Sequence, residues 1–257
     1  GVALIIYAVC IWTILDLEAR PSVTHRTPPT LRRAIAAGLV LITYNTSVVS
    51  PAEAPKKWTD LADPKWKNKV SIGHPGFRGY VGTWVVQMKK LYGWDYFKKL
   101  EQNKPRIGRS INDTVTMLNA KESIVAAGPS ATTLESKAKG NPLAVVYPED
   151  GAILMVSASG ILKNAPAPNA GKLFMEYLLS REGNEVMVQQ HQDPVNKHVK
   201  PMTGGKSIAE VKTIRPTAVE IDRALSTLET IARERGVAVG VASALPISID
   251  RLAAWSK

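Results

Sequence analysis

Short β-type runs alternate with amphipathic helical segments along most of the chain, and this alternation is what most limits its fold. Leu39 to Thr46 (LVLITYNT) is a strong β run, and further strands are predicted at residues 70–72, 106–110, 123–127 and 144–147. Segments with helical periodicity separate these strands, so that a strand recurs roughly every 15 to 25 residues. Such alternation predicts a parallel or mixed sheet that is covered by helices on both faces.

The stretch from Lys56 to Tyr92 gives the most detailed local prediction. It reads as a short helix ended by Asp63-Pro64, a strand at 70–72, and a loop with glycine at every third residue before a second helix. Thr83 is expected to cap this helix. The apolar positions at helical spacing are Trp84, Val85, Met88 and Leu91. A glycine loop between a strand and a helix start exposes backbone N–H groups to a carboxylate or phosphate. The alternative is an ordinary turn in which glycine serves backbone geometry alone.

The pattern W-x-D-L-x-D-P-K-W-K-x-K, which begins at Trp58 and leads into the strand and the glycine-rich turn, points to a known family. It resembles the bacterial extracellular solute-binding proteins of ABC importers, in the branch that includes the periplasmic iron(III)-binding proteins. The resemblance covers about residues 39–220. It implies an α/β, periplasmic-binding-protein-like (type II) fold of two lobes that close over a ligand. It also implies a periplasmic protein that works with the membrane subunits of an ABC importer.

Mapped onto this chain, the resemblance implies a complete second lobe and a partial first lobe. Residues 45–149 form the complete α/β lobe, while residues 39–44 and 150–220 supply the crossing strands and the partial first lobe. Gly151 to Asn164 reads as a buried strand pair on the return crossing. Because residues 1–38 do not resemble the missing first-lobe segment, a non-binding fragment of a fused reading frame is an alternative.

The two ends of the chain differ from the middle. Within residues 1–38, the apolar stretch Gly1–Leu15 is interpreted as a truncated export signal or membrane anchor, with a buried helix or strand as the alternative, and a proline-rich linker follows it. Residues 221–257 are predicted to form an α-β-α tail. This tail resembles a stretch of the divergent polysaccharide deacetylase family, without that family's metal-site motif. The second resemblance supplies the alternative function, a carbohydrate-active hydrolase.

Composition and motif searches favour a binding protein over an enzyme. A net charge of +11 is typical of proteins that bind nucleic acids. Here the basic residues are scattered on amphipathic segments, so we expect them to lie on solvated helix faces and expect no nucleic-acid partner. The single cysteine, Cys10, excludes an intrachain disulfide and a cysteine metal cluster. The histidines lack zinc spacing, and residues 156–160 lack the first glycine of a nucleophile elbow. We therefore expect a monomer with a small-molecule ligand and no catalytic residue, metal or cofactor.

A polar cleft is predicted where the loops that follow the strands near Ile72 and Ala127 lie side by side. In the family, the end of the first crossing strand also faces the cleft. The predicted ligand-binding residues are Tyr44, Asn45, Arg78, Gly79, Tyr80, Ser130 and Thr132. Iron-binding relatives carry adjacent tyrosines in the loop that is Gly128–Thr133 here. This loop has hydroxyl groups instead, which favours a small polar or anionic organic solute over Fe(III). Arg78 offers a fork for a carboxylate or phosphate, with a solvated loop side chain as the alternative.

Overall fold

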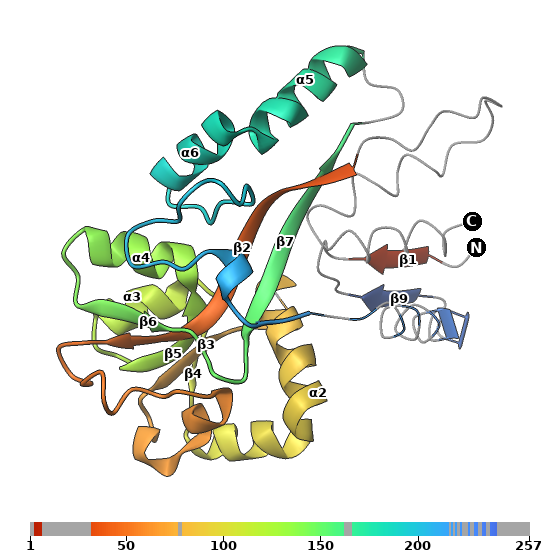
Figure 1. The fold of residues 1–257 in the computed structure, drawn as a ribbon. Helices are drawn as coiled ribbons and strands as arrows, with labels where there is room; N and C mark the ends of the chain where they lie inside the picture. The colour runs from red at the N-terminus through yellow and green to blue at the C-terminus, as the bar shows by residue number, and fades with distance from the viewer. Residues whose placement is uncertain are drawn as a thin grey trace.

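A long strand, β2 (Arg32–Asn45), organises the fold (Figure 1). The structure is a computed structural model that describes residues 3–6, 32–76, 79–161, 166–215, 217, 219, 222, 226, 229–230, 233–234 and 237–240. Within these residues β2 belongs to a seven-stranded sheet of order β4-β3-β5-β2-β7-β8, and β6 pairs with β2 off this path. The other strands are β3 (Val70–Gly73), β4 (Arg106–Gly108), β5 (Val125–Pro129), β6 (Leu143–Val146), β7 (Ala152–Gly160) and β8 (Thr213–Ile214).

The sheet is mixed, as the alternation of strands and helices predicts. Strand β3 runs parallel to β4 and β5, whereas β2 runs antiparallel to β5, β6 and β7. The stretch 151–164 was expected to hold a strand pair, and within its described residues, 151–161, it contains one strand, β7. Strand β2 begins at Arg32 rather than Leu39, so it is long enough to pair with β7 from Arg32 to Val40. The two strands form a ribbon that leaves the lobe (Figure 1).

Both faces of β2 are buried from residue 37 to residue 45, which explains the apolar run in this part of the strand. The side chains of Val40, Ile42 and Tyr44 face a core that contains Trp58 and Trp84. The side chains of Ala37, Leu39 and Leu41 face a smaller core with Leu154 and Ile208. Helix α2 (Gly79–Gln102) covers the first face, while α3 (Asp113–Asn119) and α4 (Ser130–Ala138) cover the other side of the lobe (Figure 1).

Helix α2 begins at Gly79, so the prediction that Thr83 caps it is wrong. Gly82, which was predicted to lie in the glycine loop, is inside the helix, because burial of neighbouring side chains such as Trp84 stabilises helical backbone more than glycine opposes it. The sequence Gly93–Gln102 (GWDYFKKLEQ) by itself predicts a separate amphipathic helix, and Gly93, with φ of 68°, interrupts α2 at that point. Leu91 was expected on the buried face but is largely exposed.

The tryptophan-rich motif forms two 3₁₀ turns, η1 (Trp58–Ala62) and η2 (Pro64–Trp66), separated at Asp63 as the Asp-Pro pair predicts. Trp58 has no exposed surface, and its indole Nε1 donates to the carbonyl oxygen of Gly151 at 2.8 Å. The motif therefore anchors the turn that leads the chain back into β7.

Helices α5 (Pro168–Leu179) and α6 (Arg181–Gln189) form a corner near the far half of the β2–β7 ribbon (Figure 1). The Ser180 hydroxyl caps α6 by accepting a hydrogen bond from the Gly183 amide at 3.0 Å. The helical spacing of Leu173, Phe174, Tyr177 and Leu178 predicts that this face of α5 is buried. Leu173, Phe174 and Tyr177 are exposed instead, and Met175 is the buried side chain of the helix. A third 3₁₀ turn, η3 (Ile208–Glu210), lies over the smaller core.

The described parts of the two chain ends form a separate sheet, in which β1 (Ala3–Ile6) runs parallel to β9 (Val237–Gly240). Ala3–Ile6 is thus a strand within the apolar start, and β9 lies in the tail that was predicted to have α-β-α order. The rest of the apolar start and the last predicted helix lie outside the described residues. Of the helices in the described ranges, none is long and apolar enough to cross a membrane.

Candidate functional site

The carboxyl ends of three parallel strands meet at one edge of the sheet. Gly73 at the end of β3 pairs with Gly108 at the end of β4, and Ser71 of β3 pairs with Ala126 of β5. The segments that follow these strands therefore emerge side by side, as predicted. Because α2 follows β3 and α4 follows β5 directly, both helices begin at this edge. Each helix start brings unpaired N–H groups and a partial positive charge.

Strand β2 passes this edge at Gly38 and Leu39, and three elements converge there. Tyr80, the second residue of α2, lies against Gly38, where an added Cβ would stand 2.8 Å from the tyrosine hydroxyl oxygen. Ser130, the first residue of α4, contacts Leu39 from the edge that β5 leaves. Asp193 reaches the same place from the loop that follows α6 and forms an antiparallel bridge with Ala37.

The Ser130 hydroxyl is fully engaged within the protein. It accepts a hydrogen bond from the Leu39 amide at 3.3 Å and donates one to Asp193 Oδ2 at 2.6 Å. Ser130 is 1% exposed and Asp193 is 7% exposed. Burial raises the pKa of the Asp193 carboxyl, while the hydrogen bonds from Ser130 and the Leu39 amide act in the opposite direction. Ser130 therefore has no proton left to donate to a ligand, although it fixes the start of α4.

Thr132 lies in the first turn of α4, not in a loop. The predicted loop Gly128–Thr133 does not exist as such, because β5 continues to Pro129 and α4 begins at the next residue. The Thr132 hydroxyl contacts Asn112 Oδ1 at 3.2 Å, which joins α4 to the segment that follows β4. Gly79 is the first residue of α2, and Arg78 lies outside the described residues.

The structure does not bring Tyr44 and Asn45 to this edge. Strand β2 is antiparallel to β5, and Tyr44 pairs with Val125 at the opposite end of that strand. Burial raises the pKa of Tyr44. Asn45 is fully buried, and its side chain donates to the Leu118 carbonyl at 2.8 Å. The prediction that these two residues line the same cleft as Tyr80 and Thr132 is therefore wrong, and Asn45 stabilises a turn instead.

Sequence reasoning missed Gly38 and Asp193. Gly38 sits inside a strong β run, where a glycine marks a strand position that a neighbouring group approaches closely. Asp193 precedes Pro194 in a polar loop and carries no local sign of burial. Its partner Ser130 is 63 residues away in the sequence.

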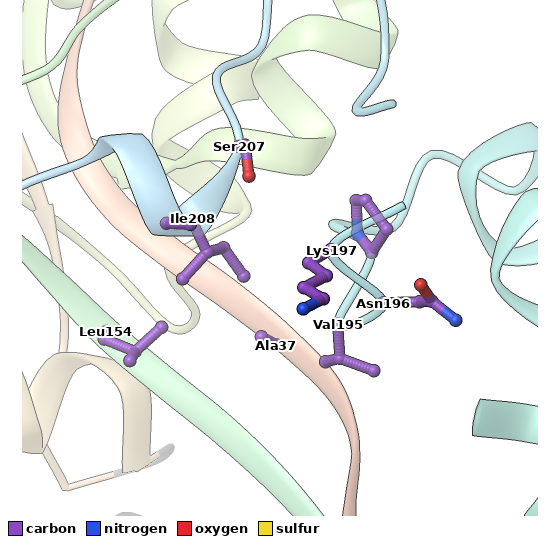
Figure 2. Close-up of a pocket in the computed structure, with 9 residues that line it drawn as sticks. Ala37, Leu154, Val195, Asn196, Lys197, Ser207 and Ile208 are labelled. Atoms are coloured by element: carbon purple, nitrogen blue, oxygen red, sulfur yellow. The ribbon is translucent and has the colours of Figure 1, made fainter. Parts of the chain in front are cut away.

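A pocket of about 270 Å³ lies beside this junction, over the smaller core. Figure 2 shows Ala37 and Leu154 on the two ribbon strands, with Val195 approaching from the loop after α6 and Ile208 from η3. None of the predicted ligand-binding residues that the structure describes lines it. Across the described residues, no group of three or more His, Cys, Asp and Glu side chains is placed to hold a metal ion.

Comparison with a family model and with curated proteins points to one group of proteins, the bacterial solute-binding proteins. The family model described as bacterial extracellular solute-binding protein matches residues 20–206. A Salmonella typhimurium protein, named as a 2-aminoethylphosphonate-binding periplasmic protein, is 28% identical over 150 residues, which are 54% of this chain and 44% of that protein. The chain thus spans less than half the length of this relative.

Solved structures show the same fold. The periplasmic binding protein AfuA from Actinobacillus pleuropneumoniae, with exogenous fructose-6-phosphate bound, is 26% identical with a TM-score of 0.60, over 71% of this chain and 60% of AfuA. Iron-bound HitA from Pseudomonas aeruginosa is 21% identical with a TM-score of 0.63, over 79% of this chain and 68% of HitA. These likenesses confirm the α/β, periplasmic-binding-protein-like fold class.

Proposed function

Because the chain belongs to the bacterial extracellular solute-binding protein family, we propose that it captures a small organic anion in the periplasm and delivers it to the membrane subunits of an ABC importer. Capture requires closure of two lobes over the ligand and no chemical step. The observation that carries the proposal is the meeting of the starts of α2 and α4 at one edge of the sheet, beside Gly38 and Leu39.

The chemistry of this edge favours an anionic group with several oxygen atoms. Two helix starts supply N–H donors and positive partial charge, which suit a phosphate, phosphonate or carboxylate. The names given to the Salmonella and Actinobacillus proteins refer to ligands with a phosphonate or a phosphate group. We therefore propose a small organic phosphate or phosphonate as the ligand class. The first turn of α4, Ser130–Thr133, offers hydroxyls rather than the anionic oxygens that Fe(III) prefers.

The proposed roles of the site residues follow from their positions. Gly79 and Tyr80 present the start of α2, and Thr132 presents a hydroxyl in the first turn of α4. Arg78 precedes α2 in the sequence and is proposed to supply the charged fork. Ser130 is proposed to hold α4 in place rather than to contact the ligand, because its hydroxyl is engaged.

The proposal includes a monomer without enzymatic activity and without a nucleic-acid partner. Some exposed lysines in the described ranges pair with neighbouring carboxylates, as Lys98 does with Asp95 at 2.8 Å and Lys139 with Glu135 at 2.6 Å. Such mixed surfaces are typical of solvated helices and differ from the basic stripe of a nucleic-acid-binding face. Light scattering on the purified chain measures the oligomeric state.

Isothermal titration calorimetry with 2-aminoethylphosphonate, fructose-6-phosphate and ferric citrate tests the ligand class. We expect heat of binding with one of the two phosphorus-containing probes. Arg78→Ala should weaken that binding by about 1.5–3 kcal/mol, the typical loss of a hydrogen bond to a charged group. The control is Arg181→Ala, because Arg181 pairs with Glu185 on the exposed surface of α6. Binding of ferric citrate alone, or equal effects of the two arginine variants, would contradict the proposal.

A further inference from the structure

A short segment, residues 190–196, connects the α5–α6 corner to the sheet edge. It is held at two points, and at the first of them Asn184 of α6 binds its end at Val195 and Asn196. Asn184 is fully buried on α6. Its side-chain amide donates to the carbonyls of Leu178 and Ser180 at 2.9 and 3.0 Å. Its oxygen accepts from the amides of Val195 and Asn196 at 2.9 and 3.0 Å. These four hydrogen bonds use the full capacity of the side chain, so this end of the segment moves with the corner.

The second anchor of the segment is Asp193. Its carboxylate accepts the hydrogen bond from Ser130 at 2.6 Å, close to the Leu39 amide. Its backbone forms the bridge with Ala37 on β2. Asp193 therefore contacts both the start of α4 and the strand that crosses out of the lobe.

Only Pro194 separates Asp193 from Val195, whose amide is bound by Asn184. The two attachment points are therefore a single residue apart in the chain. Proline fixes one of the two soft backbone angles at this position. By contrast, the β2–β7 ribbon that leads to the same corner is two strands wide along Arg32–Ala37, apart from the bridge to Asp193. A two-stranded ribbon is weakly stable on its own and twists readily. The orientation of the corner therefore depends on the second connection.

We propose that Asp193 is a positioning residue that fixes the α5–α6 corner against the start of α4, so that loss of its hydrogen bond to Ser130 lets the two parts pivot about the β2–β7 ribbon. A lobe-closing protein needs a small number of contacts that hold one lobe orientation and release another. A single buried hydrogen bond with short links on both sides meets that need. The inference concerns orientation alone and does not depend on which solute is bound.

The test measures the distance between the two parts by pulsed electron paramagnetic resonance in the full chain. Spin labels are placed on cysteines at Ala138 of α4 and Lys172 of α5, both exposed, in a Cys10→Ser background. We expect a narrow distance distribution in the reference protein. Asp193→Ala should give a broader distribution with a displaced mean, and Asp193→Asn, which keeps an acceptor oxygen, should give a smaller change.

Ser130→Ala removes the same hydrogen bond without placing a new group at Asp193, so it serves where Asp193→Ala does not fold. It should broaden the distribution as much as Asp193→Ala, and the double variant should broaden it no further. Thr132→Ala is the control, because its hydroxyl contacts Asn112 and not the segment. A role limited to stability would lower the melting temperature of Asp193→Ala or Ser130→Ala and leave the distribution unchanged. That result, or an equally broad distribution in the reference protein, would overturn the proposal.

Discussion

Asp150 lies in the turn before β7 and should contribute more to the free energy of unfolding than a typical surface carboxylate. Its Oδ2 accepts a hydrogen bond from the Trp58 amide at 2.9 Å and another from the Tyr92 hydroxyl. The pKa of Tyr92 is raised, first by burial and then by this carboxylate. Asp150 thus ties the turn before β7 to the tryptophan-rich motif and to α2.

The expected cost of Asp150→Ala follows from these contacts. Each hydrogen bond to a charged acceptor contributes about 1.5–3 kcal/mol, and the substitution would leave the Trp58 amide without an acceptor. Asp150 Oδ1 is buried and has no hydrogen-bond partner among the described residues, so the carboxylate already costs some free energy in the fold. Taking both terms together, we expect a loss of about 2–4 kcal/mol in the free energy of unfolding.

Urea unfolding followed by tryptophan fluorescence measures this loss, since Trp58 lies at the contact. Tyr92→Phe should cost about 1–2 kcal/mol, and the double variant should lose less than the sum of the single variants. Glu149→Ala is the matched control, because its pair with Lys57, at 3.7 Å, is more than half exposed on both sides. Its cost should stay under about 1 kcal/mol. If Asp150→Ala costs no more than Glu149→Ala, or if the two losses at Asp150 and Tyr92 simply add, the reasoning is refuted.

Three further predictions use the same unfolding assay. Gly183→Ala should destabilise by about 2 kcal/mol or more, because the new Cβ would stand 2.1 Å from the Tyr177 carbonyl oxygen; a negligible loss would show that the α5–α6 corner yields freely. Asn45→Ala should cost about 1–3 kcal/mol, because it leaves the buried Leu118 carbonyl without its donor, while ligand affinity measured by calorimetry should not change. For Asp193, burial raises the folded pKa, so the native protein loses stability as pH rises through that value, whereas Asp193→Asn does not. The unfolding free energy of the native protein relative to Asp193→Asn should therefore increase as pH falls from 7 toward the unfolded pKa of 3.8, and a decrease would contradict the assignment.

Local sequence patterns determined the elements and the buried anchors of the lobe. The 3₁₀ turns around Trp58, the break at Asp63, the strand from Val70 and the helix interruption at Gly93 all occur where the patterns predict them. These features depend on periodicity, on proline and glycine geometry, and on large apolar side chains. Each of them acts over a few neighbouring residues.

Element boundaries at the site were less predictable. The glycine stretch around Gly79 and Gly82 and the stretch Gly128–Thr133 are both predicted as loops, yet these residues lie in regular elements, because packing against the sheet outweighs local propensity. The exposed face of α5 is the reverse case. Its amphipathic pattern predicts that Phe174 is buried, but Phe174 is exposed. Such a pattern shows which face of a helix is apolar and not whether another part of the protein packs against that face.

The composition of the candidate site was decided by tertiary structure. Tyr44 and Thr132 both follow patterns typical of a ligand edge, but strand direction sends them to opposite ends of β5. The sequence contains no local signal for that direction, since an antiparallel neighbour looks the same as a parallel one within a short β run. Asp193 meets Ser130 across 63 residues for the same reason. The sequence by itself determined which polar groups were available and that helices would start after strands, whereas long-range pairing decided which of those groups share an edge.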